Sequence, residues 1–295
     1  MNRYNSLIEI FLLVSDFVKS YFNKNFMEKN TSPNENYFHD DEVMTVYLFG
    51  IQVRLHSVKE VHDYICSHFK DCFPKIPEYH AFNYRLNKCH KLFKALCDHL
   101  FENNDLSTDI KEVVQSIDSF PIVVSKKTRK MSDIKKDDLL NNGYCSSKKL
   151  YYYGGKGHIA IVNQEASLGK PIFFELAPAS NHDLPVAKKL IHEFKKGTLI
   201  GDKAYISKQF KDNLLKNDVI LVNPIKLSKN KKEYDETEKI YNRAVSSRRQ
   251  SIEIFFAWLI QLTKIQKASF IRSVSGFLFF VYSRIAFMLL KLQHV

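Results

Sequence analysis

The hydrophobic pattern of the chain changes near residue 112, and this change constrains the fold more than any other feature. Before it, apolar residues recur at helical spacing; after it, short runs rich in Val, Ile and Phe alternate with helical stretches. Five runs predict strands, at residues 113–125, 157–166, 170–179, 198–205 and 219–226. Helices are predicted between the last three of these strands. We therefore expect an α/β fold, a mixed five-stranded sheet flanked by helices.

The part of the chain before this change is predicted to be all helical. Leu7, Phe11, Val14, Val18 and Phe22 lie at helical spacing and predict a helix over residues 1–29. Further helices are predicted at 42–55, 58–73 and 80–102, the first with Asp40 or Asp41 as its cap. After the strands, helices are predicted at 248–266 and 275–293. We expect two domains, a helical region at 1–110 and a sheet domain at 111–295.

Two apolar stretches could suggest export or a membrane span. Near the N-terminus, Glu9 and Asp16 interrupt the apolar run and no small-residue cleavage site follows, which favours an amphipathic helix. Near the C-terminus, residues 276–290 contain Arg284 and are too few for a span, which favours a buried core helix. Five cysteines without framework spacing argue against a secreted disulfide scaffold. We expect a cytoplasmic protein with no membrane partner.

The net charge of +12 lies in two segments. Residues 126–156 hold 9 Lys/Arg and 3 Asp, and residues 203–250 hold 12 Lys/Arg and 6 Asp/Glu, so each segment carries +6. Concentrated positive charge of this kind is expected of a protein that binds a polyanion such as DNA. The alternative is a set of solvated lysine-rich loops, which the charge alone does not exclude.

Three carboxylates are candidate metal ligands. They are Asp118 within the first predicted strand, Asp202 just past the fourth, and Glu253 in a late helix. Each has a plain alternative. Asp118 could face water, Asp202 could be a turn residue after a glycine, and Glu253 could form an exposed ion pair with Arg249. That pair would have the less favourable order, cation first, and Glu253 borders the apolar stripe of its helix. We therefore expect Glu253 to be partly buried and to suit a metal ligand.

Acids from separate elements are what a magnesium-dependent phosphodiester reaction needs. Mg²⁺ takes oxygen ligands, and two such ions can activate the attacking oxygen and stabilise the leaving one. Basic residues beside the acids would neutralise the DNA backbone.

Other groupings of reactive residues give weaker signals. Cys89, His90, Cys97 and His99 share one predicted helix, whereas zinc ligands usually come from short loops, so buried thiols are the better interpretation. In the His182–Asp183 pair, Asp183 is expected to cap a helix. The segment at 154–158, GGKGH, lacks the spacing of a phosphate loop. Lys156 and His158 could nevertheless contact a phosphate. Tyr151, Tyr152 and Tyr153 could stack on bases, or simply form a strand that approaches the core.

Several stretches in order along the chain resemble a known family. They are FPKIPEYHAFNYRL, SIDSFPIVV, YGGKGHIAIV, APASNHD, GDKAY and RRQSIEIFF. In combination they resemble bacterial insertion-sequence transposases of the DDE type, most closely the insertion-sequence family numbered 982. The chain departs from neighbouring families at Ser246, where they carry a tyrosine three residues before the arginine that corresponds to Arg249.

The resemblance implies a ribonuclease-H-like catalytic domain with Asp118, Asp202 and Glu253 as catalytic residues and metal ligands. It implies two Mg²⁺ ions, for which Mn²⁺ would substitute, and a helical region at 1–110 that binds DNA ends. The implied reaction is strand cleavage at terminal inverted repeats and transfer of the freed 3′-hydroxyl into target DNA, by a homodimer or larger assembly on the bacterial nucleoid. Residues expected to contact DNA are Arg249, Lys203, Lys156, His158, Lys126, Lys127 and Arg129. Two alternatives remain: a nuclease with this core that never joins strands, and a catalytically silent DNA-binding relative.

Overall fold

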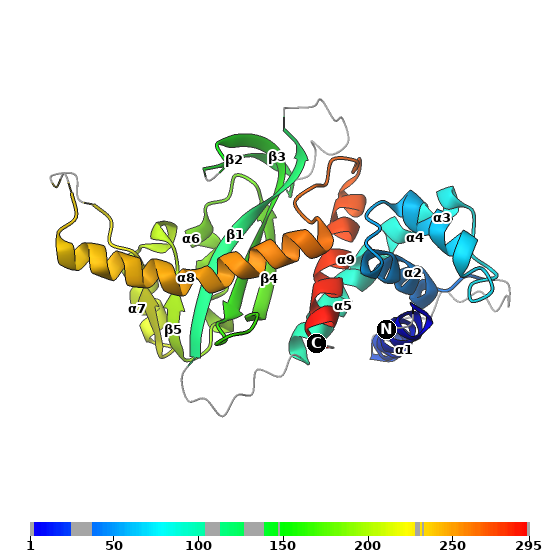
Figure 1. The fold of residues 1–295 in the computed structure, drawn as a ribbon, viewed down its shortest axis with the longest axis horizontal. Coiled ribbons are helices and arrows are strands. Elements are labelled where there is room, and N and C mark those ends of the chain that lie inside the picture. Colours follow the sequence, from blue (N-terminus) through cyan, green and yellow to red (C-terminus); the bar gives the residue numbers. More distant parts are fainter. Residues whose placement is uncertain are drawn as a thin grey trace. The chain divides into compact units, whose positions relative to one another are not determined.

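The chain forms two compact units in the computed structural model, which describes residues 3–24, 37–103, 113–126, 139–146, 148–227, 231 and 233–293 (Figure 1). The helical unit comprises Met1–Asn103, Leu262–Ile265 and Ile271–Val295. The sheet unit comprises Asn104–Gln261 and Gln266–Phe270. The last helix therefore groups with the N-terminal helices, whereas the sequence placed it in the sheet domain. The division of function between residues 1–110 and 111–295 stays a prediction.

In the helical unit, the helices at 40–52, 79–88 and 90–102 pack on the last helix of the chain, and the helices at 3–24 and 58–68 pack on those three. The helices of the unit are α1 (Arg3–Lys24), α2 (Asp40–Gln52), α3 (Val58–His68), α4 (Tyr79–Lys88), α5 (His90–Glu102) and α9 (Val274–Gln293). The single helix predicted at 80–102 is interrupted at Cys89, because the His90 ring is hydrogen-bonded to the Asn87 carbonyl and so competes with the helical ladder. The N-cap of α2 is His39 rather than Asp40 or Asp41, and Glu42 in the first turn accepts from the His39 backbone N–H at 2.6 Å.

Two of the thiols of the helical unit belong to its core. Cys89 and Cys97 are buried, and burial raises the pKa of both. No group of three or more His, Cys, Asp and Glu residues in the described part of the chain is placed to hold a metal ion. Within the Cys/His cluster predicted on one helix, Cys89 and Cys97 are thus buried, as expected from the sequence.

Arg284 lies in the middle of α9 and is 1% exposed. Its guanidinium donates hydrogen bonds to the carbonyls of Thr263, Phe280 and His56 and to the Tyr47 hydroxyl, at 3.0–3.2 Å. The same group lies 3.6 Å from the centroid of the Phe280 ring. A buried cation is tolerated here because acceptors from several segments surround it. Arg284 thus ties α9 to the rest of the helical unit.

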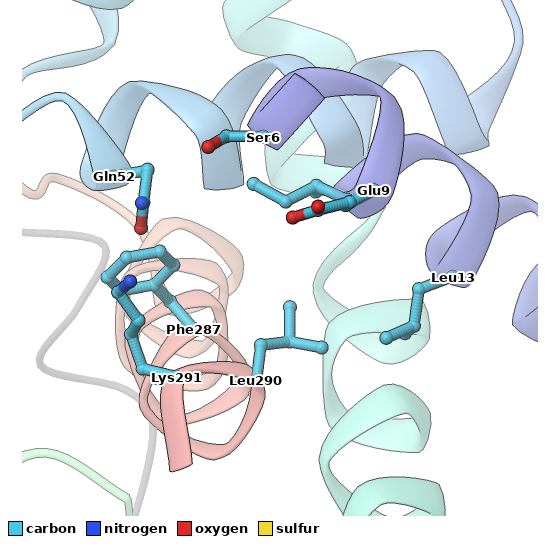
Figure 2. A pocket seen from close by; sticks show the side chains of 8 residues that line it. Ser6, Glu9, Leu13, Gln52, Phe287, Leu290 and Lys291 are labelled. Atoms are coloured by element: carbon cyan, nitrogen blue, oxygen red, sulfur yellow. The ribbon is translucent and has the colours of Figure 1, made fainter. Parts of the chain in front are cut away.

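The α9 helix is long and apolar enough to cross a membrane by length and composition, but 72% of its most apolar window is buried inside the structure. This agrees with the core helix predicted from Arg284. One small pocket of about 60 Å³ remains where α1 meets α9 (Figure 2). Leu13 and Glu9 border it from α1, and Phe287 and Leu290 from α9.

The sheet unit contains a six-stranded sheet, with strand order β2-β3-β1-β5-β6 and with β4 paired to β3. The strands are β1 (Val113–Ser125), β2 (Asn141–Cys145), β3 (Leu150–Val162), β4 (Lys170–Pro178), β5 (Gly197–Ile200) and β6 (Val219–Val222). The pairs among β1 to β4 are antiparallel, and β5 is parallel to β1 and β6. The mixed sheet is as predicted, but β2 lies outside the five runs predicted to be strands. Its sequence, NNGYC, lacks the apolar residues that mark a strand, and it forms by pairing along β3.

Helices cover both faces of this sheet. On one face, Ile117 of β1 shares a buried cluster with Ala187 of α6 (Asp183–Lys189) and Phe210 of α7 (Lys208–Leu215). On the other face runs α8 (Glu236–Thr263), the long yellow-to-orange helix of Figure 1, where Phe256 contacts Phe120 of β1 with ring centroids 5.1 Å apart. Two short 3₁₀ helices, η2 (Ile191–Glu193) and η3 (Lys203–Tyr205), complete the unit. Neighbouring residues of β1 therefore face different helices.

Arg284→Ala should lower the free energy of unfolding of the helical unit by about 3 kcal/mol or more, because it leaves a cavity and orphans buried acceptors. Arg284→Lys should recover only part of this, since an ammonium cannot reach acceptors in all these directions. The measurement is the loss of helical circular dichroism in urea. Arg272→Ala, at an exposed arginine of the same unit, is the matched control. Equal stability of Arg284→Ala and Arg272→Ala would contradict the role given to Arg284.

Candidate active site

Two of the three predicted acids are neighbours because of strand register. The parallel pairing of β1 with β5 sets Ser116 opposite Ile200. Asp118 and Asp202 each follow two residues later, so both lie where β5 ends. Carboxyl ends of parallel strands are a usual place for functional groups in sheets of this kind. The structure thus places two carboxylates on adjacent segments, one within β1 and one just after β5.

Asp118 is largely buried and held by two donors. Its Oδ2 accepts from Arg249 of α8 at 3.0 Å, and its Oδ1 accepts from the Ser119 backbone N–H at 2.8 Å. Burial nevertheless raises the pKa of Asp118 to about 6, and the nearby Asp202 and Asp183 carboxylates act in the same direction. The Ser119 hydrogen bond and the Arg249 charge oppose this rise without cancelling it. A further positive charge beside Asp118 would therefore stabilise the ionised form of its carboxyl group.

Asp202 forms the cap of η3, as its Oδ1 accepts from the Ala204 N–H at 2.7 Å. Its backbone carbonyl accepts from the Asn223 side chain at 2.8 Å. Gly201 allows the chain to turn tightly here: a Cβ at that position would lie 2.9 Å from the Tyr205 ring. The turn predicted from the glycine is present, and it carries the carboxylate beside Asp118.

Glu253 does not join this pair. The sequence predicted a partly buried side chain at the sheet-facing edge of its helix, and this is wrong in the structure, because Glu253 is exposed. The rotation of α8 is set by Ile252 and Phe255, which are fully buried. Arg249 pairs with Asp118 across 131 residues of sequence instead of with Glu253 one turn away. Among the described residues, no three potential ligands are gathered for a metal ion.

A basic groove opens beside Asp202. We define it by six of its lining residues, Asp202, Lys203, Tyr234, Lys239, Arg243 and Arg249. The hollow has a volume of about 540 Å³. Arg249 and Lys203, two of the residues expected to contact DNA, both line it, and so do Lys239 and Arg243, which were not among those expected. Their signal was present in the sequence, because positions 239, 243, 246 and 249 recur at helical spacing along one face of α8.

Lys156 and His158 lie on the other face of the sheet, in a polar cluster that the sequence did not predict. There Asp183 Oδ1 accepts from Ser119 Oγ at 2.9 Å and from Lys156 Nζ at 3.2 Å, and His158 Nδ1 lies 3.8 Å away. The cap of α6 is His182, so Asp183 stands in the first turn and turns its side chain to β1 and β3. The antiparallel register, with Ser119 opposite His158, brings these groups together.

The DNA contacts predicted for this pair are not supported by the geometry. His158 is 0% exposed, and Lys156 is bonded to Asp183 and to the Asn181 carbonyl. Burial lowers the pKa of His158, and Lys156 acts in the same direction, while Asp183 opposes them. Neither ring nitrogen of His158 makes a hydrogen bond within the described residues. Of the other predicted contacts, Lys126 is exposed just after β1, and Lys127 and Arg129 lie outside the described residues.

His158 should lower the free energy of unfolding of the sheet unit as the pH falls below about 6.5, because the unfolded chain binds a proton there that the folded chain disfavours. Below about pH 6, proton uptake by Asp118 in the folded chain acts in the opposite direction. His158→Gln should flatten this part of the profile even where the variant is less stable overall. The measurement is urea unfolding at several pH values, followed by the fluorescence of Trp258, the one tryptophan of the chain. His192→Gln, at an exposed histidine of the same unit, should keep the wild-type slope. An unchanged slope in His158→Gln would contradict the assignment.

Comparison with known proteins identifies the family of the chain. A family model described as "Transposase DDE domain" matches residues 109–289, more than half of the chain. No curated protein and no solved structure matches. The matched range contains Asp118, Asp202, Glu253 and the basic groove, and the mixed six-stranded sheet flanked by helices agrees with the ribonuclease-H-like fold of such transposases. The chain therefore belongs to the family of transposases with a DDE domain.

Proposed function

We propose that the chain is an insertion-sequence transposase, similar to the insertion-sequence family numbered 982, that cuts DNA at the ends of its element and joins them to target DNA. In the cutting step a water oxygen attacks phosphorus and the bond to the 3′ oxygen breaks, which frees a 3′-hydroxyl. In the joining step that hydroxyl attacks phosphorus of a target phosphodiester, and the bond from phosphorus to the 3′ oxygen of the target strand breaks. The observation that carries the proposal is the pair of carboxylates beside a basic groove, within a chain of the DDE transposase family.

The residues at the site fit a divalent ion in part. Transposases of this family generally use divalent metals. Asp118 and Asp202 offer the oxygen ligands that Mg²⁺ and Mn²⁺ take, and Asp118 already accommodates a cation in Arg249. Such an ion would stabilise negative charge that develops on the reacting phosphate. Glu253 is exposed, so a second ion with Glu253 as a ligand rests on the family resemblance and not on this geometry.

The partners follow from the same proposal. The groove and the exposed Lys126 suit a DNA backbone, and the helical region is proposed to bind the terminal inverted repeats. A homodimer or larger assembly would hold two ends together in the cytoplasm, on the nucleoid. A nuclease that never joins strands, or a silent DNA-binding relative, would share this site. The two adjacent carboxylates favour a catalyst over the silent relative.

Asp118→Asn should abolish strand cleavage and keep DNA binding, because it removes a charged oxygen ligand without changing the shape of the side chain. The measurement is cleavage and joining of labelled DNA carrying the ends of the element, with Mg²⁺ or Mn²⁺, together with a binding assay in EDTA. Asp212→Asn, at an exposed acid on α7, is the matched control and should retain full activity.

Cleavage by Asp118→Asn at the wild-type rate would refute the catalytic assignment. Cleaved products without joined products would favour the nuclease alternative. Binding without any cleavage by the wild-type protein would favour the silent relative.

A further inference from the structure

The polar cluster around Asp183 occupies a place where apolar side chains would serve the fold equally well. The same face of the sheet carries the buried apolar residues Ile117 and Ala187. The side chains of Asp183 and Lys156 are only 20% and 16% exposed. Replacing a largely buried ion pair by apolar residues of similar volume is often neutral or stabilising. Stability of the fold therefore does not account for the cluster, and its place on β1 next to Asp118 is the feature to explain.

Ser119 joins this cluster to Asp118. Its hydroxyl donates to Asp183 Oδ1 at 2.9 Å, and its backbone N–H donates to Asp118 Oδ1 at 2.8 Å. Lys156 Nζ donates to the same Asp183 oxygen at 3.2 Å and to the Asn181 carbonyl at 2.8 Å, so the acceptor is held from β3 as well. A chain of hydrogen bonds therefore runs from the first turn of α6, through one residue of β1, to the Asp118 carboxylate.

The two oxygens of Asp118 have partners of different kinds. Its Oδ1 accepts from the backbone of β1, whereas its Oδ2 accepts from the Arg249 side chain at 3.0 Å. A metal ion could take the place of a side-chain cation at Oδ2, but the Ser119 N–H belongs to the strand and stays beside Oδ1. The Ser119 bond therefore sets the plane of the carboxylate and the direction in which Oδ2 meets a cation. Groups that hold a metal ligand in this way typically contribute about 10- to 100-fold to metal affinity or activity.

We propose that Asp183 is a positioning residue of the candidate active site, which orients the Asp118 carboxylate through the Ser119 hydroxyl. The inference rests on the proposed function and adds Asp183 and Ser119 to its site. Lys156 holds Asp183 in the orientation that accepts from Ser119. Asp183 and Ser119 act through Asp118 and contact neither the ion nor the DNA.

The test measures binding of Mn²⁺ to the DNA-free protein, followed by the loss of the electron paramagnetic resonance signal of free Mn²⁺. Ser119→Ala and Asp183→Ala should each weaken Mn²⁺ binding by roughly tenfold. Ser119→Thr keeps the hydroxyl and should bind Mn²⁺ within about twofold of wild type. With labelled DNA carrying the ends of the element, Ser119→Ala and Asp183→Ala should lower kcat for cleavage and leave KM and the affinity for DNA in EDTA unchanged.

Two controls on the same strand separate positioning from stability. Ser116→Ala removes a buried hydroxyl that makes no hydrogen bond within the described residues, and it should leave Mn²⁺ binding unchanged. Gln115→Ala removes the oxygen that accepts from the Lys195 backbone N–H at 2.9 Å. It should lower the free energy of unfolding without weakening Mn²⁺ binding. Urea unfolding followed by Trp258 fluorescence gives the free energy of unfolding of every variant.

The double variant Ser119→Ala/Asp183→Ala shows whether the two residues act along one path. It should bind Mn²⁺ no more weakly than the weaker single variant, because the second substitution removes a link that the first has already broken. Two independent contributions would instead multiply to a loss of roughly 100-fold. If Asp183→Ala does not fold, the comparison of Ser119→Ala with Ser119→Thr and Ser116→Ala decides the outcome.

The inference is overturned if the two losses multiply, if Ser119→Ala binds Mn²⁺ as Ser116→Ala does, or if Gln115→Ala weakens Mn²⁺ binding as much as Asp183→Ala. Wild-type protein that binds Mn²⁺ and cleaves DNA, with both single variants at wild-type affinity, would refute this inference and leave the proposed function in place. Wild-type protein that neither binds Mn²⁺ nor cleaves DNA would refute the proposed function as well.

Discussion

The parallel pairing of β1 with β5 sets the positions of the two aspartates of the candidate site. It aligns Ser116 with Ile200, and Asp118 and Asp202 each lie two residues further along the chain from this aligned pair. The pairing begins at Gly197, whose φ of +127° suits glycine and whose Cβ, if it had one, would lie 2.2 Å from the Val113 carbonyl oxygen. Fully buried Leu199 holds the short strand in the core. The acids therefore stand on backbone whose geometry depends on hydrogen bonds and packing, not on the acids themselves.

The α8 helix packs on the sheet with one face and lines the basic groove with another. Its residues Ile252, Phe255 and Leu259 are fully buried. Its exposed face carries the cations of the groove, and Arg249 stands where the two faces meet and reaches Asp118. The ion pair offsets only part of the cost of burying that carboxylate, since the pKa of Asp118 is still raised to about 6. Keeping the Asp118 carboxylate ionised therefore lowers the stability of the folded state.

Alternation along β1 separates two polar networks that lie very close in sequence. Asp118 faces α8 and pairs with Arg249, while Ser119 faces α6 and bonds to Asp183. The networks still interact electrostatically, because Asp183 contributes to the raised pKa of Asp118. Lys156 compensates the Asp183 charge within the second network. A strand of period two can thus carry two separate polar networks on its two faces at the same point.

The sequence by itself determined the fold class, five of the strands and the two aspartates, because apolar periodicity and turn residues act locally. It also indicated the core role of the helix around Arg284, since a lone cation in a short apolar run disfavours a span. Only the tertiary structure decided the β2 strand, whose polar residues pair with a partner distant in the chain. Only the tertiary structure turned Glu253 to solvent and Asp183 to Ser119, because the rotation of a helix and the reach of a side chain depend on what packs beneath them. Side-chain partners between remote segments are a property of packing, and no local pattern encodes them.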